Sequence, residues 1–165
     1  MNKKTYIIGP VGSGKTTFAT NLSKKYSINY YELDKVSWDD ENGNIKRSNE
    51  DAIKIFNNIL KNKSWIIEDV GREIFKQGRY DADIIYYIKL SRLKSYYRVT
   101  KRWIRQRLGK ERYNHPPTLK QWIYYISTVN SYYKQEKNKL KSLKEFKNKL
   151  VFVRKKDIDK ILEGR

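Results

Sequence analysis

The sequence contains no cysteine and only one histidine, His115. Without cysteine the chain can form neither a disulfide framework nor a thiolate metal site. A single histidine cannot build a metal cluster, and we expect His115 to be a loop residue. No apolar run approaches the roughly 18 residues of a membrane-spanning helix. These absences exclude disulfide scaffolds, thiolate metalloproteins and helical membrane proteins.

The first five residues lead directly into a short apolar run and lack the apolar segment of a signal peptide. We therefore predict a cytoplasmic protein with no membrane partner. A length of 165 residues predicts one domain over residues 1–165, long enough to enclose a sheet with helices on both faces. No internal repeat is present, and no oligomeric state is predicted.

The positive charge of the chain is concentrated in its second half. Residues 1–90 hold 15 Lys and Arg against 12 Asp and Glu, whereas residues 91–165 hold 22 against 6. Such a field attracts polyanions, either nucleotides held by a few arginines or a nucleic-acid backbone contacted along a stripe. The alternative is that the lysines only form a solvated surface.

The most specific motif is a glycine-rich loop at residues 9–16, Gly-Pro-Val-Gly-Ser-Gly-Lys-Thr, which follows an apolar strand and precedes a predicted helix over 15–25. Gly12 and Gly14 can adopt backbone angles closed to other residues, so that consecutive N–H groups wrap an anion at the start of the helix. We predict that this loop binds the phosphates of ATP. The predicted cofactor-binding residues are Gly9, Val11, Gly12, Ser13, Gly14, Lys15, Thr16 and Thr17.

Two side chains of the loop region carry the predicted chemistry. Lys15 is expected to meet the β- and γ-phosphates, and the Thr16 hydroxyl to bind Mg²⁺, which prefers oxygen ligands. The apolar run over 65–69 reads as a buried strand that ends in two acids. Glu68 is the predicted acid on the magnesium side, with Asp69 as the alternative.

The acceptor side of the site is predicted around Asp34, which follows an expected strand over 28–33. Ligands of open α/β sheets bind at the carboxyl ends of the strands. Asp34 could orient or deprotonate an acceptor hydroxyl or bond to a sugar or base edge, or it could only cap a turn. Residues 38–44 read as a loop over this site, in which Trp38 could stack on a ligand.

A helical stretch over 93–108 carries Arg98, Arg102 and Arg105, whose spacing places them on one face. In a kinase such arginines would close over the phosphoryl group, since guanidinium groups match its charged oxygens. The alternative is a solvated basic face. The following segment, with a glycine and two prolines, predicts a hinged lid over about 105–119.

The other expected elements complete an alternating α/β pattern. Ser48 and Asp51 form a near match to a capping box and predict the start of a helix. The further predicted elements are a strand over 83–90, an amphipathic helix from 119, a lysine-rich helical segment over 134–149, a strand over 150–153 and a helix over 157–163.

Taken together, these segments resemble the bacterial DNA topology modulation proteins, a family similar to adenylate kinase and the other small nucleoside monophosphate kinases. The resemblance covers nearly the whole chain, although only the phosphate loop is specific by itself. The segments that carry it are residues 9–16, 33–34 with Trp38, 65–68, 83–90, Arg98-Val99 with Arg102, and 151–154.

The resemblance implies a P-loop NTPase three-layer sandwich with a five-stranded parallel sheet of order 2-3-1-4-5, ATP and Mg²⁺ at the loop, and an acceptor pocket near Asp34. It implies that Arg72 holds an acceptor phosphate and that Arg98 and Arg102 are lid arginines. The relatives have Asp-Gly after the third strand, where this chain has Glu68-Asp69, which leaves the magnesium-side acid open.

The predicted function is an ATP-dependent phosphotransferase whose small acceptor could be a nucleotide. The predicted catalytic residues are Lys15, Arg98, Arg102 and Asp34, the substrate-binding residues are Asp34, Trp38 and Arg72, and the metal-binding residues are Thr16 and Glu68. The alternative is a nucleic-acid-associated protein that uses its nucleotide site as a switch. Weak nucleic-acid binding by the basic half is compatible with both.

Overall fold

The computed structural model describes residues 3–39, 45–111 and 117–163. Its strands are β1 (Lys4–Ile8), β2 (Tyr30–Glu32), β3 (Trp38–Asp39), β4 (Ile45–Lys46), β5 (Trp65–Asp69), β6 (Ile84–Ile88) and β7 (Leu150–Val153). Its α-helices are α1 (Lys15–Tyr26), α2 (Leu33–Ser37), α3 (Asn49–Leu60), α4 (Lys76–Asp81), α5 (Arg92–Arg107), α6 (Leu119–Leu143) and α7 (Lys155–Glu163). Two 3₁₀ turns, η1 (Glu73–Phe75) and η2 (Lys144–Phe146), complete the set.

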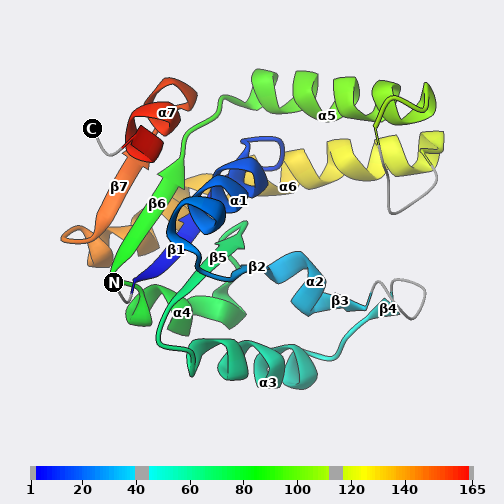
Figure 1. The fold of residues 1–165 in the computed structure, drawn as a ribbon. Coiled ribbons are helices and arrows are strands. Elements are labelled where there is room, and N and C mark those ends of the chain that lie inside the picture. The colour runs from blue at the N-terminus through cyan, green and yellow to red at the C-terminus, as the bar shows by residue number, and fades with distance from the viewer. Residues whose placement is uncertain (1–2, 40–44, 112–116, 164–165) are drawn as a thin grey trace.

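Five strands form one parallel sheet in the order β2-β5-β1-β6-β7, with helices on both of its faces (Figure 1). The predicted α/β fold with a five-stranded parallel sheet is confirmed. The strand order is 2-5-1-6-7 and differs from the predicted 2-3-1-4-5, because the chain forms two further strands outside this sheet. These strands, β3 and β4, pair with each other in an antiparallel hairpin between β2 and α3.

Alternating side chains of the central strands enter two hydrophobic cores. On β1, Ile7 packs with residues of α1 and α7, whereas Tyr6 and Ile8 pack with residues of α3, η1 and α6. This period of two is expected for a strand that is buried on both faces. All three side chains are fully buried. The central strands therefore hold the loop after β1 on a rigid base.

The structure corrects two local predictions that concern the acceptor side. The strand β2 is shorter than the one expected over 28–33, and Asp34 lies two residues past its end, in the first turn of α2. Trp38 belongs to β3 and pairs with Lys46, where the sequence predicted a loop over 38–44. Residues 40–44 of that predicted loop lie outside the described residues.

The helical predictions are closer to the structure. Ser48 caps α3 as expected, accepting a hydrogen bond from the Asp51 backbone N–H at 3.1 Å. The lysine-rich segment over 134–149 continues α6, which runs for 25 residues, before η2. Helix α4 and the turn η1 were not predicted. Within the described ranges, no helix is both long and apolar enough to pass through a bilayer.

Candidate active site

The glycine-rich loop connects β1 to α1 at the carboxyl edge of the sheet. Gly12 and Gly14 have φ angles of 76° and 95°, in the left-handed region that glycine adopts without strain. Gly14 is also the N-cap residue of α1 and supplies no side-chain hydrogen bond to the first turn. Unpaired N–H groups at a helix start and the helix dipole together favour an anion. The loop therefore has the backbone that phosphate binding requires.

Lys15 is buried at the start of α1, and its Nζ atom donates to the Pro10 carbonyl oxygen at 3.1 Å. Burial lowers the pKa of the ammonium group, and the carboxylates of Glu68 and Asp34 act in the opposite direction. An ammonium group has three donors, so Lys15 keeps capacity for an anion held by the loop. A negative charge beside Lys15 would stabilise the charged form of this buried side chain.

Thr16 and Glu68 lie side by side, and the Thr16 hydroxyl donates to Glu68 Oε1 at 3.0 Å. The other carboxylate oxygen, Glu68 Oε2, is buried and has no hydrogen-bond partner in the described part of the chain. Burial raises the Glu68 pKa to about 7, against the attraction of Lys15. Two hard oxygen donors with one oxygen unsatisfied fit a magnesium ion. The structure thus brings Glu68, and not Asp69, next to Thr16.

Glu68→Gln should change how the stability of the ligand-free protein depends on pH. Burial raises the folded-state pKa from 4.5 to about 7, so between these values the folded protein binds more protons than the unfolded chain. Stability should therefore fall as pH rises through this window, by up to about 3 kcal/mol from this group. Chemical denaturation at several pH values should show a flatter profile for Glu68→Gln. Equal slopes in both proteins would contradict the raised pKa.

Asp69 organises the turn after β5 instead of facing Thr16. Its Oδ2 atom accepts the backbone N–H groups of Gly71 at 2.8 Å and Arg72 at 2.5 Å, and its Oδ1 atom pairs with Arg72 Nη1 at 2.6 Å. The other guanidinium nitrogen, Nη2, pairs with Asp34 Oδ1. Lys139 on α6 donates to the carbonyl oxygens of Val70 and Gly71. Arg72 is therefore fixed between two carboxylates.

A cavity of about 250 Å³ lies next to Arg72. Its lining residues are Ser37, Trp38, Lys46, Arg47, Asn49, Ala52, Arg72 and Ile74. The guanidinium group of Arg47 donates to the Trp38 carbonyl oxygen at 2.7 Å and pairs with Asp39 at 3.1 Å, which fixes the β3–β4 hairpin as a wall. Two of the predicted substrate residues, Trp38 and Arg72, line this cavity, and the third, Asp34, bonds to Arg72.

Sequence reasoning missed four polar residues of this cavity, namely Ser37, Lys46, Arg47 and Asn49. Ser37 is the last residue of α2 and Asn49 the first of α3, while Lys46 lies in the two-residue strand β4 and Arg47 directly follows it. Segments this short show no periodic pattern in the sequence. The neighbouring cations Lys46 and Arg47 were the only hint.

The three arginines of α5 have different contacts in the structure. Arg98 Nη1 donates to the carbonyl oxygens of Gly12 and Ser13, at 2.8 and 3.3 Å, and so touches the phosphate loop. The guanidinium of Arg102 lies 4.9 Å from the centre of the Tyr125 ring. Arg105 pairs with Glu111 at 3.2 Å and is half exposed. Arg98 therefore contacts the phosphate loop, whereas Arg102 and Arg105 contact an aromatic and an acidic neighbour. The catalytic role of Arg102 stays a prediction.

The remaining predicted positions lie around the same loop. Ser13 is buried and Thr17 is exposed on α1. The Val11 carbonyl oxygen accepts a hydrogen bond from Ser95 Oγ at 2.5 Å. Gly9 lies within contact distance of β6, since a Cβ there would meet the Ile88 carbonyl oxygen at 2.9 Å. These contacts fix the loop against β6 and α5.

The predicted lid over 105–119 joins α5 to α6. Within it, Gly109 has a φ angle of 66°, and Trp103 Nε1 donates to the Thr118 carbonyl oxygen at 2.9 Å. Residues 112–116, which include His115, lie outside the described residues. The lid therefore stays a prediction.

No protein-family model matches the chain, and no curated protein matches it. Among solved structures, the chain is similar to a gluconokinase from Sinorhizobium meliloti 1021, with a TM-score of 0.56 over 98% of this chain and 88% of that chain. The two sequences are 14% identical. The resemblance to the DNA topology modulation proteins is not confirmed by these comparisons and stays a prediction. What the similarity shows is a fold shared with this kinase.

Proposed function

We propose that the protein is an ATP-dependent kinase that transfers the γ-phosphoryl group of Mg-ATP to a small acceptor. The observation that carries this proposal is the arrangement of two sites at one edge of the sheet. Lys15, Thr16 and Glu68 form the donor side, and Arg72 with Asp34 borders a separate cavity. The carboxylates of Glu68 and Asp34 both oppose the lowering of the Lys15 pKa, which supports a donor side and an acceptor side that lie near each other.

On the donor side, the loop N–H groups and Lys15 would hold the phosphates of ATP. Thr16 would bind the magnesium ion directly, and Glu68 through a water molecule. When bound, the ion would neutralise negative charge on the phosphates. Arg98, whose guanidinium donates to the Gly12 and Ser13 carbonyl oxygens, would meet phosphates that the loop holds. Arg102, which lies against the Tyr125 ring, stays the second predicted lid arginine.

On the acceptor side, the cavity favours a small hydroxylated anion over a nucleotide. Its volume of about 250 Å³ is below the roughly 300–1,000 Å³ of sites for drug-sized ligands. Arg72 and Lys46 provide positive charge, and Ser37 and Asn49 provide hydrogen bonds to hydroxyl groups. The structural neighbour is named a gluconokinase, which supports the same class of acceptor for this chain.

The transfer itself needs little covalent chemistry from the protein. An acceptor oxygen forms a bond to the γ-phosphorus while the bond from that phosphorus to the bridging oxygen of ADP breaks. The Asp34 carboxylate would take the acceptor's hydroxyl proton, and Arg72 would fix the orientation of that carboxylate. The main contribution is positioning and charge stabilisation, as expected for phosphoryl transfer.

The test is a screen of sugar acids, polyols, nucleosides and nucleoside monophosphates as acceptors, with labelled ATP and Mg²⁺. We expect a labelled product from a hydroxylated acid and little from nucleoside monophosphates. Product from a nucleoside monophosphate alone would replace our acceptor class with the nucleotide alternative. ATP hydrolysis that depends on nucleic acid, with no acceptor labelled, would overturn the kinase proposal.

The nucleic-acid alternative gives its own prediction. Lys141, Lys144 and Lys147 are exposed, whereas Lys139 is partly buried against the carbonyl oxygens of Val70 and Gly71. Replacing the three exposed lysines with glutamine should abolish any weak, salt-sensitive DNA binding and leave kinase turnover unchanged. Lys139→Gln should lower kinase turnover and leave DNA binding unchanged, because it loosens the turn that carries Arg72. DNA binding is measured by fluorescence anisotropy at two salt concentrations, and kinase activity by a turnover assay.

A further inference from the structure

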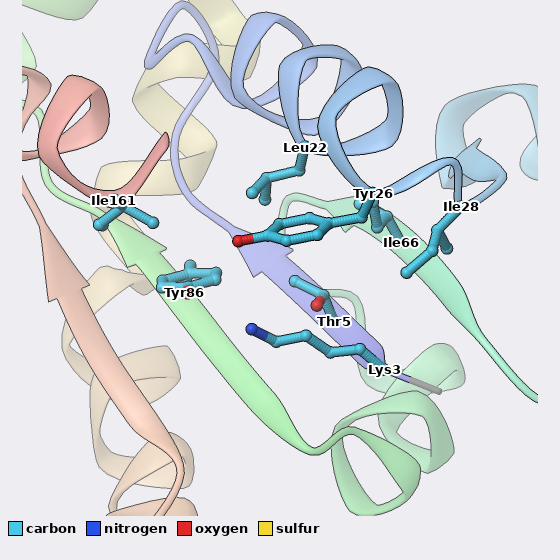
Figure 2. A pocket seen from close by; sticks show the side chains of 8 residues that line it. All are labelled: Lys3, Thr5, Leu22, Tyr26, Ile28, Ile66, Tyr86 and Ile161. Carbon is cyan, nitrogen blue, oxygen red and sulfur yellow. The ribbon is translucent and has the colours of Figure 1, made fainter. Parts of the chain in front are cut away.

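A second cavity lies on the opposite edge of the sheet from the phosphate loop. It has a volume of about 230 Å³ and lies between the end of α1, the helix α7 and the amino-terminal half of the central strands. Its lining residues are Lys3, Thr5, Leu22, Tyr26, Ile28, Ile66, Tyr86 and Ile161 (Figure 2). Helix α1, whose 12 residues span roughly 18 Å, separates this cavity from the phosphate loop. It is therefore no part of the candidate active site.

Thr5 and Tyr86 each place a hydroxyl group at this cavity. Thr5 is 3% exposed and Tyr86 is 6% exposed. No hydrogen bond joins either hydroxyl to another residue in the ranges 3–39, 45–111 and 117–163. Neither hydroxyl oxygen is a fully buried atom, so both are open to the cavity. A hydroxyl group that has no protein partner and faces a cavity can hydrogen-bond to a polar ligand there.

The other lining residues indicate which kind of ligand would fit the cavity. Leu22, Ile28, Ile66 and Ile161 are aliphatic and suit an apolar body. The Tyr26 ring lies beside the cavity with the Lys3 ammonium group 5.6 Å from its centre. In Figure 2 the Lys3 side chain extends toward the space between Thr5 and Tyr86. The lining thus combines the Lys3 ammonium group and the hydroxyl groups of Thr5 and Tyr86 with the aromatic ring of Tyr26.

We propose that this cavity binds a small aromatic carboxylate, with its ring against the aliphatic walls and Tyr26 and its carboxylate at Lys3. The volume of about 230 Å³ fits a single ring and excludes a nucleotide. A monoanion matches the single ammonium group, and its oxygens accept hydrogen bonds from the Thr5 and Tyr86 hydroxyls. This site goes beyond the proposed kinase function and does not depend on it.

The test uses fluorine NMR titration of the full chain with para-fluorobenzoate, and with neutral para-fluorobenzamide as the matched probe. We expect saturable binding of the benzoate and binding of the benzamide that is weaker by about tenfold or more. Lys3→Met should cause a similar loss for the benzoate, and Tyr86→Phe, which removes one hydroxyl, about threefold. Lys24→Met, which changes an exposed lysine outside the cavity, should leave binding unchanged.

Binding must also be independent of the phosphate loop. The affinity for para-fluorobenzoate should stay the same in Lys15→Met and in the presence of saturating Mg-ATP. Loss of binding in either condition would place the carboxylate at the loop and overturn the proposal. Absence of saturable binding, equal affinity for the benzamide, or unchanged affinity in both cavity variants would overturn it as well.

Discussion

Lys15→Met is expected to reduce phosphoryl transfer by about a thousandfold or more, since a single cation on the transferring phosphoryl group can contribute about 10³–10⁵ to the rate. Methionine keeps most of the side-chain length and removes the charge together with the N–H donors, including the one that the Pro10 carbonyl oxygen accepts. The protein should remain folded, because burial lowers the pKa of Lys15 and the ligand-free protein therefore gains little from this ammonium group. Steady-state turnover and thermal unfolding of the same preparation give both results.

The matched control is Lys24→Met, which removes an exposed lysine from the same helix. Its turnover and unfolding temperature should equal those of the wild type, so that a loss specific to Lys15 is not a consequence of net charge. Calorimetry with a non-hydrolysable ATP analogue should show a smaller loss of affinity than of turnover. Normal turnover in Lys15→Met would remove the basis of the donor site.

The sequence was most informative where local chemistry determines structure. The glycine-rich loop could be predicted because Gly12 and Gly14 allow φ angles that other residues resist, and the structure has both glycines there. The buried strands β1, β5 and β6 could be predicted because compact apolar runs of this length suit a parallel sheet covered on both faces. The cap at Ser48 likewise depends on residues only three positions apart.

The parts that could not be predicted depend on contacts between distant segments. Which acid lies next to Thr16 depends on the pairing of β1 with β5. The structure has Glu68 there, and the role of Glu68 toward magnesium stays a prediction. The spacing of Arg98 and Arg105 places them on neighbouring parts of one helix surface but does not say what they meet. The structure shows the loop carbonyl oxygens at Arg98 and Glu111 at Arg105.

The hairpin β3–β4 was missed for a similar reason. Each of its strands has two residues, too few for an alternating pattern to emerge above the polar composition of the region. Its stability depends on Arg47, which bonds to the carbonyl oxygens of Lys35 and Trp38. A lone arginine in a polar segment does not reveal such a role in the sequence.

Asp34→Asn is expected to slow phosphorylation of a hydroxyl acceptor by about a hundredfold or more, because a positioned general base contributes about 10²–10⁴ to the rate. Asparagine keeps the shape and still accepts a hydrogen bond from Arg72, so the turn held by Asp69 should be unchanged. Slow ATP hydrolysis by water should persist, since the donor-side residues Lys15, Thr16 and Glu68 are intact.

The comparison of the two activities decides the role of this carboxylate. Asp159→Asn, which changes an exposed residue of α7, is the matched control and should leave both activities at the wild-type level. If acceptor phosphorylation and ATP hydrolysis fall together in Asp34→Asn, the carboxylate supports Arg72 and Lys15 and is not the base. If neither falls, the acceptor atom is a phosphate oxygen, which needs no deprotonation, and the hydroxylated acid is the wrong class. A selective loss of acceptor phosphorylation would support proton transfer to Asp34. The substitution removes the charge of a side chain that pairs with Arg72 at the cavity, while the donor-side residues are unchanged.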